Sequence, residues 1–132
     1  MDTDNMTITI ISSLLSGLVG VIVSSAYYRR FEHRKAKQDV LRRLVGNRMF
    51  LTDKLMTEKN RDLFVALNEI FVVYSDCPAV ITALKKMHNE LGQQGRLLDN
   101  LVSLIKEMCK ASGVPFGKLN DNFIESPFTP KN

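Results

Sequence analysis

The residues with the clearest chemical capacity are eight basic side chains gathered between residues 29 and 48. Only Glu32 and Asp39 accompany them, so this stretch carries a net charge of +6, while the residues before it sum to −2 and those after it to zero. Dense guanidinium and ammonium groups attract phosphates of lipids, nucleotides or nucleic acids. We predict an anion-binding segment whose candidate residues are Arg29, Arg30, Arg34, Lys35, Lys37, Arg42 and Arg43. The alternative is that these bases only hold a neighbouring membrane helix in place.

Residue patterns for catalysis or metal binding are absent from the sequence. There is no glycine-rich phosphate loop, no HExxH and no paired cysteine motif; Cys77 and Cys109 are 32 residues apart, and His33 and His88 are 55 apart. Asn68 lies among apolar residues and is predicted to be a hydrogen-bonded structural amide. We therefore expect no catalytic residues, no metal and no cofactor, and a protein that is not an enzyme.

A second chemical pattern is a row of small and hydroxylated residues. Ser12, Ser16, Gly20 and Ser24 recur every four residues, which places them on one face of a helix. Small residues allow membrane helices to approach closely, and serine hydroxyls bond across such contacts. The row predicts self-association of the helix. In an oligomer, the same hydroxyl-bearing face could line a narrow water-filled pore.

The segment that carries this row is long enough to cross a membrane. Residues 6–28 are 23 residues without a charge, about 34 Å as a helix against a hydrocarbon core of about 30 Å. Tyr27 and Tyr28 end the run and bases follow at once. A cleaved signal peptide and a buried soluble helix are the alternatives, and the acidic start, Asp2 and Asp4, disfavours the first. The bases predict an outside N-terminus and a cytoplasmic C-terminal domain.

The elements expected after the span are all helical. We predict three parts: residues 1–28 as outside N-terminus and transmembrane helix, 29–50 as a basic neck helix, and 51–132 as a helical bundle with an extended tail. The first bundle helix is capped by Thr57, the second by Ser75 or Asp76 and ended by Gly92, and the third ends at Gly113. Their expected core stripes are Leu63, Phe64, Leu67, Ile70, Phe71 and Tyr74; Val80, Ile81, Leu84, Met87, His88 and Leu91; and Leu97, Leu98, Leu101, Val102, Ile105 and Met108.

A bundle of about 80 residues is marginal as a lone core. Docking on the neck helix or on other protomers would complete it. We therefore expect a homo-oligomer, of which a tetramer is one possible size.

The chain resembles a group of small bacterial proteins with one membrane helix and a helical cytosolic domain. The positions that carry the resemblance are Arg48, the run LFVALNEIF at 63–71, Val80, Ala83, the run LLDNLVSLIKEM at 97–108, Gly113 and Phe116. These proteins often have a tyrosine-rich tail, where this chain has Phe123 and Phe128. They are similar to the membrane effector of Hailong-type anti-phage defence systems.

The resemblance implies a mechanism and a location. An operon-encoded nucleotidyltransferase would make a single-stranded DNA oligomer or nucleotide that holds the effector shut in the bacterial inner membrane, and its loss would open an ion channel and depolarise the cell. The alternative is a non-channel tether or scaffold that recruits a protein partner through the bundle. A holin-like lysis protein is a third reading, for which the folded domain is larger than permeabilisation requires.

Overall fold

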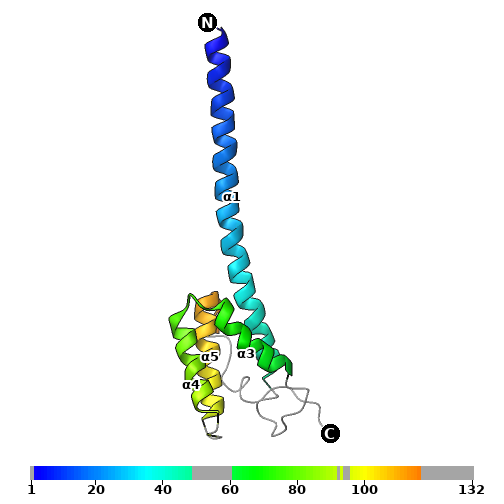
Figure 1. Ribbon diagram of the computed structural model, residues 1–132, viewed down its shortest axis with the longest axis vertical. Helices are drawn as coiled ribbons and strands as arrows, with labels where there is room; N and C mark the ends of the chain where they lie inside the picture. The colour runs from blue at the N-terminus through cyan, green and yellow to red at the C-terminus, as the bar shows by residue number, and fades with distance from the viewer. Residues whose placement is uncertain (1, 49–60, 92, 94–95, 117–132) are drawn as a thin grey trace. The chain divides into compact units, whose positions relative to one another are not determined.

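The computed structural model describes residues 2–48, 61–91, 93 and 96–116, and these residues are almost wholly helical (Figure 1). The helices are α1 (Asp2–Gly46), α3 (Arg61–Val73), α4 (Pro78–Asn89) and α5 (Leu97–Ser112). No strand occurs in these ranges, so the all-α prediction is confirmed. The chain divides into two compact units, and the boundary between them in the sequence falls between His33 and Arg34.

The first unit is the N-terminal part of α1. All of its described side chains are exposed, and the large apolar ones, such as Leu14, Ile22 and Val23, remain about three-fifths exposed. This helix is long and apolar enough to cross a membrane. A continuous apolar surface of this size is not stable in water, so it requires lipid or other protein around it.

The second unit is a helical bundle with one core. The last part of α1 contributes Val40, Leu41 and Leu44 to that core, which joins them to residues of α3, α4 and α5. Helices α4 and α5 pack side by side (Figure 1). The other core residues that are at most 2% exposed are Leu63, Ala66, Ile70, Tyr74, Val80, Met87, Leu101, Leu104, Ile105, Met108 and Cys109. The neck helix therefore supplies one wall of the bundle, as the small size of the bundle led us to expect.

The helix ends follow local chemistry at two positions. Pro78 is the first residue of α4, where its missing N–H costs nothing. Gly113 caps α5 in the left-handed conformation with φ of 71°, as predicted. The predicted cap of α4 is wrong: Cys77 occupies the N-cap, with no side-chain cap bond, and the carboxylate of Asp76 binds Lys37 instead.

Other predicted boundaries differ or lie outside the described residues. Helix α1 ends at Gly46 rather than at residue 50, and α4 ends at Asn89. Thr57, Gly92 and the predicted tail packing of residues 117–132 fall outside the described ranges.

The predicted stripe of α3 is only partly right. Leu63, Ile70 and Tyr74 are buried, but Phe64 and Phe71 are 40% and 46% exposed, and Ala66 takes a core position in their place. This helix is apolar on nearly every side, so a period of 3.6 residues could not select which face turns inward. In α4, His88 and Leu91 are likewise exposed, whereas Val80, Leu84 and Met87 are buried as predicted.

Candidate functional site

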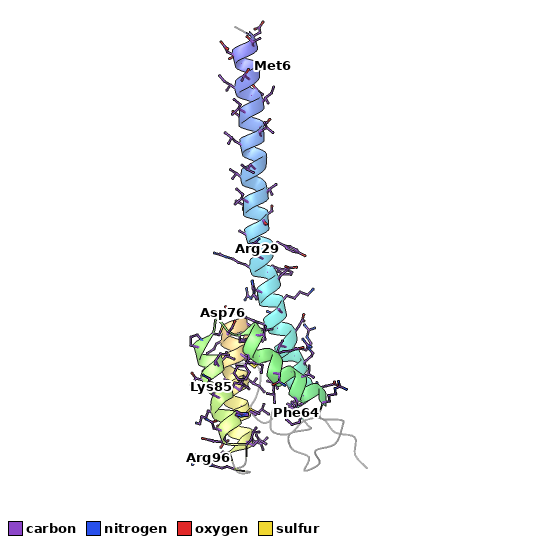
Figure 2. The ribbon with its side chains drawn as sticks, viewed as in Figure 1. Met6, Arg29, Phe64, Asp76, Lys85 and Arg96 are labelled. Carbon is purple, nitrogen blue, oxygen red and sulfur yellow. The ribbon has the colours of Figure 1, made fainter. Side chains whose placement is uncertain are left out.

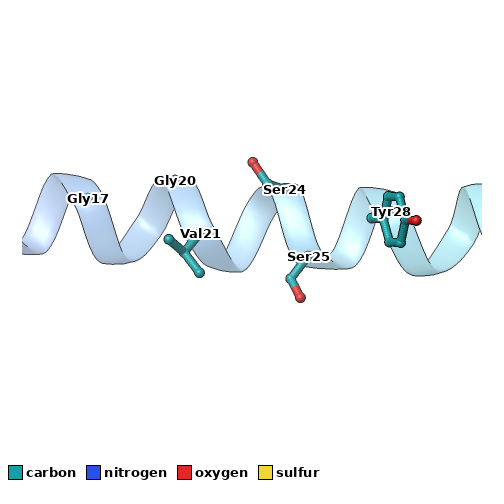
Figure 3. A pocket seen from close by; sticks show the side chains of 6 residues that line it. All are labelled: Gly17, Gly20, Val21, Ser24, Ser25 and Tyr28. Carbon is teal, nitrogen blue, oxygen red and sulfur yellow. The ribbon is translucent and has the colours of Figure 1, made fainter.

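The small residues of the apolar helix form an open groove along one side of α1. It is lined by Gly17, Gly20, Val21, Ser24, Ser25 and Tyr28 (Figure 3). A side chain added at Gly17 or Gly20 would meet nothing within 4 Å. The groove exists because glycine has no side chain, and it contains Gly20 and Ser24 of the predicted row. Ser12 and Ser16 lie further toward the N-terminus.

The hydroxyl groups of this helix fall into two classes. Those of Thr7 and Thr9 donate to the carbonyl oxygens of Thr3 and Asn5 at 2.8 Å, and Ser13 donates to Ile10 at 3.0 Å. The hydroxyls of Ser12, Ser16, Ser24 and Ser25 have no such bond within the described chain. Three members of the predicted row thus retain hydroxyl groups that a neighbouring helix could bond.

The predicted basic residues are also divided. Arg29, Arg30 and Lys35 are exposed and form no ion pair with the residues the structure describes. Figure 2 shows the Arg29 side chain pointing away from the helix. Arg42 is exposed and lies 3.6 Å from Asp39, an exposed pair of small energetic value. These four side chains are available to an external anion.

Arg34 caps the end of α5. Its Nε donates to the carbonyl oxygen of Ser112 at 3.1 Å, and the amide of Gln38 donates to the same oxygen at 3.2 Å. Both satisfy a carbonyl that the helix end leaves free, and the guanidinium is favoured by the negative end of the helix dipole. The guanidinium also occupies the space that a Cβ at Gly113 would need. Its role here is structural.

Lys37 is the one buried base among the candidates, with 8% of its surface exposed. Its Nζ lies 2.7 Å from Asp76 Oδ2 and 3.3 Å from Cys77 Sγ. The hydroxyl of Tyr74 donates to the Lys37 carbonyl at 2.7 Å, and the ammonium lies 5.8 Å from the Tyr74 ring centre. These contacts fasten α1 to the turn between α3 and α4.

The electrostatics of this cluster agree with its geometry. Burial disfavours the ammonium, but the hydrogen bonds to Asp76 and Cys77 outweigh it and raise the pKa of Lys37. The hydrogen bond from Lys37 lowers the pKa of Asp76, and burial raises the pKa of the Tyr74 phenol. Lys37 therefore stays charged and already has its counter-ion.

Arg43 is held by an acid from α3. Its Nη1 donates to Glu69 Oε1 at 3.0 Å, and its Nη2 lies 2.7 Å from Oε2, so the two residues form an ion pair between α1 and α3. Neither Asp76 nor Glu69 could be recognised as a partner from sequence alone, because each lies 26 or more residues from its base and has no spacing relation to it. Of the seven candidates, Arg34, Lys37 and Arg43 thus have partners within the bundle.

The other residues considered in the sequence analysis do not form a site within the described ranges. Asn68 is exposed and makes no side-chain hydrogen bond to any described residue, so its prediction as a satisfied structural amide is wrong. Cys109 is buried, and burial raises the pKa of its thiol. No group of three or more His, Cys, Asp or Glu that could hold a metal occurs within the described ranges.

The fold and site describe a helical protein with one candidate membrane-spanning helix and a helical bundle that includes the part of the basic segment from Arg34 onward. The family of unknown function DUF6680 matches residues 1–130, and the chain belongs to this family. No curated protein and no solved structure matches the chain.

Proposed function

We propose that this protein is an oligomeric membrane effector of bacterial anti-phage defence. It forms an ion channel that depolarises the cell and is gated by an anionic nucleic-acid or nucleotide signal on the cytosolic side. The observation that carries the proposal is the uncharged exposed helix whose unbonded serine hydroxyls share one face, in a chain whose entire basic excess follows that helix.

The proposed location is the bacterial inner membrane. The first 28 residues hold only acidic charges, and eight bases follow within 20 residues. The positive-inside rule then favours an outside N-terminus and a cytoplasmic bundle. A free thiol at Cys77 and another at Cys109 fit a reducing compartment.

The proposed channel is built from copies of α1. Helices that meet along the row Ser12, Ser16, Gly20 and Ser24 approach closely through Gly20 and exchange hydrogen bonds through the serines. A ring of such helices presents hydroxyl groups to its centre, where they hydrate a narrow path. A tetramer is the size we favour as a starting assumption.

The proposed signal binds the bases that have no strong partner within the described chain. Arg29 and Arg30 are the candidates in the first unit, and Lys35 and Arg42 are the candidates in the second, each unit taken by itself. In a homo-oligomer these charges repeat in every copy, so the attraction for a single-stranded DNA oligomer or nucleotide grows with copy number and falls steeply with salt. A ligand that binds the closed state more tightly holds the channel shut. The protein itself takes no catalytic part; an operon-encoded nucleotidyltransferase supplies the ligand.

The test is membrane potential, measured with a voltage-sensitive dye in bacteria that express the protein alone. The Ser16→Leu/Gly20→Leu double variant should abolish depolarisation because it fills the contact face. The matched control, Leu14→Phe/Leu18→Phe, adds bulk on the opposite face and should preserve it. Equal potentials in all three strains, with each protein shown to be inserted, would contradict the channel.

The alternative function is a membrane tether whose bundle recruits a protein partner. Two observations favour it: the span carries no charge that could form a constriction, and α3 has an exposed apolar face. A tether should tolerate Ser16→Leu/Gly20→Leu as long as the helix inserts. Retained anti-phage protection in that variant would favour the tether over the channel.

A further inference from the structure

Helix α3 presents an apolar face that the bundle does not use. Phe64 and Phe71 are 40% and 46% exposed, and Val65 and Val72 are 44% and 77% exposed. Asn68 is exposed between them. Spacings of three and four residues place all five on one side of the helix, opposite the buried Leu63, Ala66 and Ile70.

The order of residues on this face is symmetric about Asn68. Counted from Asn68, Phe64 and Val65 lie four and three residues before it, and Phe71 and Val72 lie three and four residues after it. If the direction of the helix is reversed about Asn68, each apolar position of the face coincides with another apolar position. Such a face is complementary to a second copy of itself, which is the requirement for a two-fold interface.

We propose that this face pairs with the same face of a second copy of the chain, with the two α3 helices antiparallel and the two-fold axis passing at Asn68. In this register Phe64 of one copy packs against Val72 of the other, and Val65 packs against Phe71. Each aromatic ring meets a smaller branched side chain, so the surfaces interlock rather than collide. The two Asn68 amides meet at the axis and exchange N–H to oxygen hydrogen bonds.

The central amide sets the register of the pair. An asparagine within an apolar helix seam is satisfied only when it meets a matching polar group, so shifted registers leave it unpaired. The proposed pairing therefore explains why a polar residue, Asn68, lies at the centre of this apolar face.

Charge at the ends of the face supports the same arrangement. Arg61 lies seven residues before Asn68, and Asp76 lies eight residues after it. The antiparallel register brings Arg61 of one copy beside Asp76 of the other, twice by symmetry. The Asp76 side chain is 68% exposed although it binds Lys37, so its carboxylate can accept from a second cation.

The small size of the face indicates which occupant suits it. Two helices of 13 residues bury a few hundred Å² on each partner, below the roughly 800 Å² of a standard stable interface. Copies held in one membrane meet at a high effective concentration, which compensates for a weak contact. The pairing does not depend on a channel or on an anionic ligand.

The experiment is disulfide cross-linking of the full chain in membranes. A Cys77→Ser/Cys109→Ala background removes the native thiols, and Asn68→Cys places one thiol at the proposed axis. Mild oxidation should give a dimer band several times stronger than the matched control Ser103→Cys, an exposed position on α5. In mixed membranes, Phe64→Cys on one tagged copy should cross-link to Val72→Cys on another more strongly than to Phe64→Cys.

Three results would overturn the proposal. The first is a dimer band no stronger than that of Ser103→Cys. The second is a cross-link within one chain between Asn68→Cys and Phe123→Cys, which would assign the face to the chain's own C-terminal segment. The third is loss of the dimer band in Ser16→Leu/Gly20→Leu, which would assign the association to the membrane helix. A band that persists in that variant supports α3 pairing whether or not the channel proposal holds.

Discussion

The two compact units differ in the burial of their side chains. In the first 33 residues, every described side chain is exposed and the apolar ones have no core to enter. From Arg34 onward, four helices share one core, and three bases of the same α1 helix find partners in it. The comparison shows that one continuous helix, α1, can be fully exposed in its first part and packed into a core in its last part. Charge density along the sequence therefore does not measure how many of the charges are available to a ligand.

The largest expected difference between the units is in stability. Ile105→Ala removes a fully buried side chain and should lower the free energy of unfolding of the bundle by about 2–5 kcal/mol. Leu18→Ala, in the exposed helix, should leave the bundle unchanged. Hydrogen exchange of the α5 amides in the full chain measures both. Equal protection in the two variants would break the distinction between the units.

Within the bundle, the Lys37–Asp76 pair should respond unequally to its two truncations. Asp76→Asn leaves a buried ammonium without its counter-ion and should cost about 1–3 kcal/mol. Lys37→Met should cost less, because the carboxylate left behind is largely exposed and stays hydrated. Denaturant unfolding of both variants checks the order. A costlier Lys37→Met would show that the lysine stem, rather than the charge pair, stabilises the turn.

The same pair predicts an acid-dependent loss of stability. The pKa of Asp76 is lower in the folded protein than its ordinary value of 3.8, so the pair stabilises the fold above that value. The contribution is lost as the pH falls through the lowered pKa. Unfolding measured from pH 6 downward should show the gap between the native protein and Asp76→Asn closing in this acid range. A gap independent of pH would contradict the ion pair.

Gly113→Ala tests the junction of α1 and α5. Alanine at φ of 71° costs about 1–2 kcal/mol, and its Cβ would displace the Arg34 guanidinium. The cost measured in an Arg34→Ala background should therefore be smaller. A thermal unfolding series on the four proteins of this cycle gives the coupling. Additive costs would show that the guanidinium moves away freely.

The smallest stability effect is expected at the bases without strong partners. Arg42→Gln should change stability by less than about 0.5 kcal/mol, since its pair with Asp39 is exposed. It should nevertheless weaken binding of a single-stranded DNA oligomer and reduce the salt slope by about 1. Fluorescence anisotropy of labelled oligomer with the purified full chain measures this. An unchanged slope would remove Arg42 from the proposed anion surface.

Local patterns predicted the parts of the molecule that local chemistry controls. In α5, Leu101, Val102, Ile105 and Met108 are buried as predicted, although Leu97 and Leu98 are only half-buried and the buried Leu104 was missed. The uncharged run and Gly113 at a helix end were also predictable. Helix α3 was not, because an almost wholly apolar helix gives no contrast between its faces. The partners of Lys37 and Arg43 were also beyond reach, since contacts 39 and 26 residues apart depend on how the helices pack.

The contact between Arg34 and Ser112 also bears on the order of events during synthesis. The two residues are 78 positions apart, so at typical translation rates roughly 4 to 16 s separate their appearance. Glu69 and Asp76 are made earlier, so Arg43 and Lys37 can find their partners before Arg34 does. For that interval the Arg34 guanidinium lacks the carbonyl oxygen at the end of α5 that it later binds.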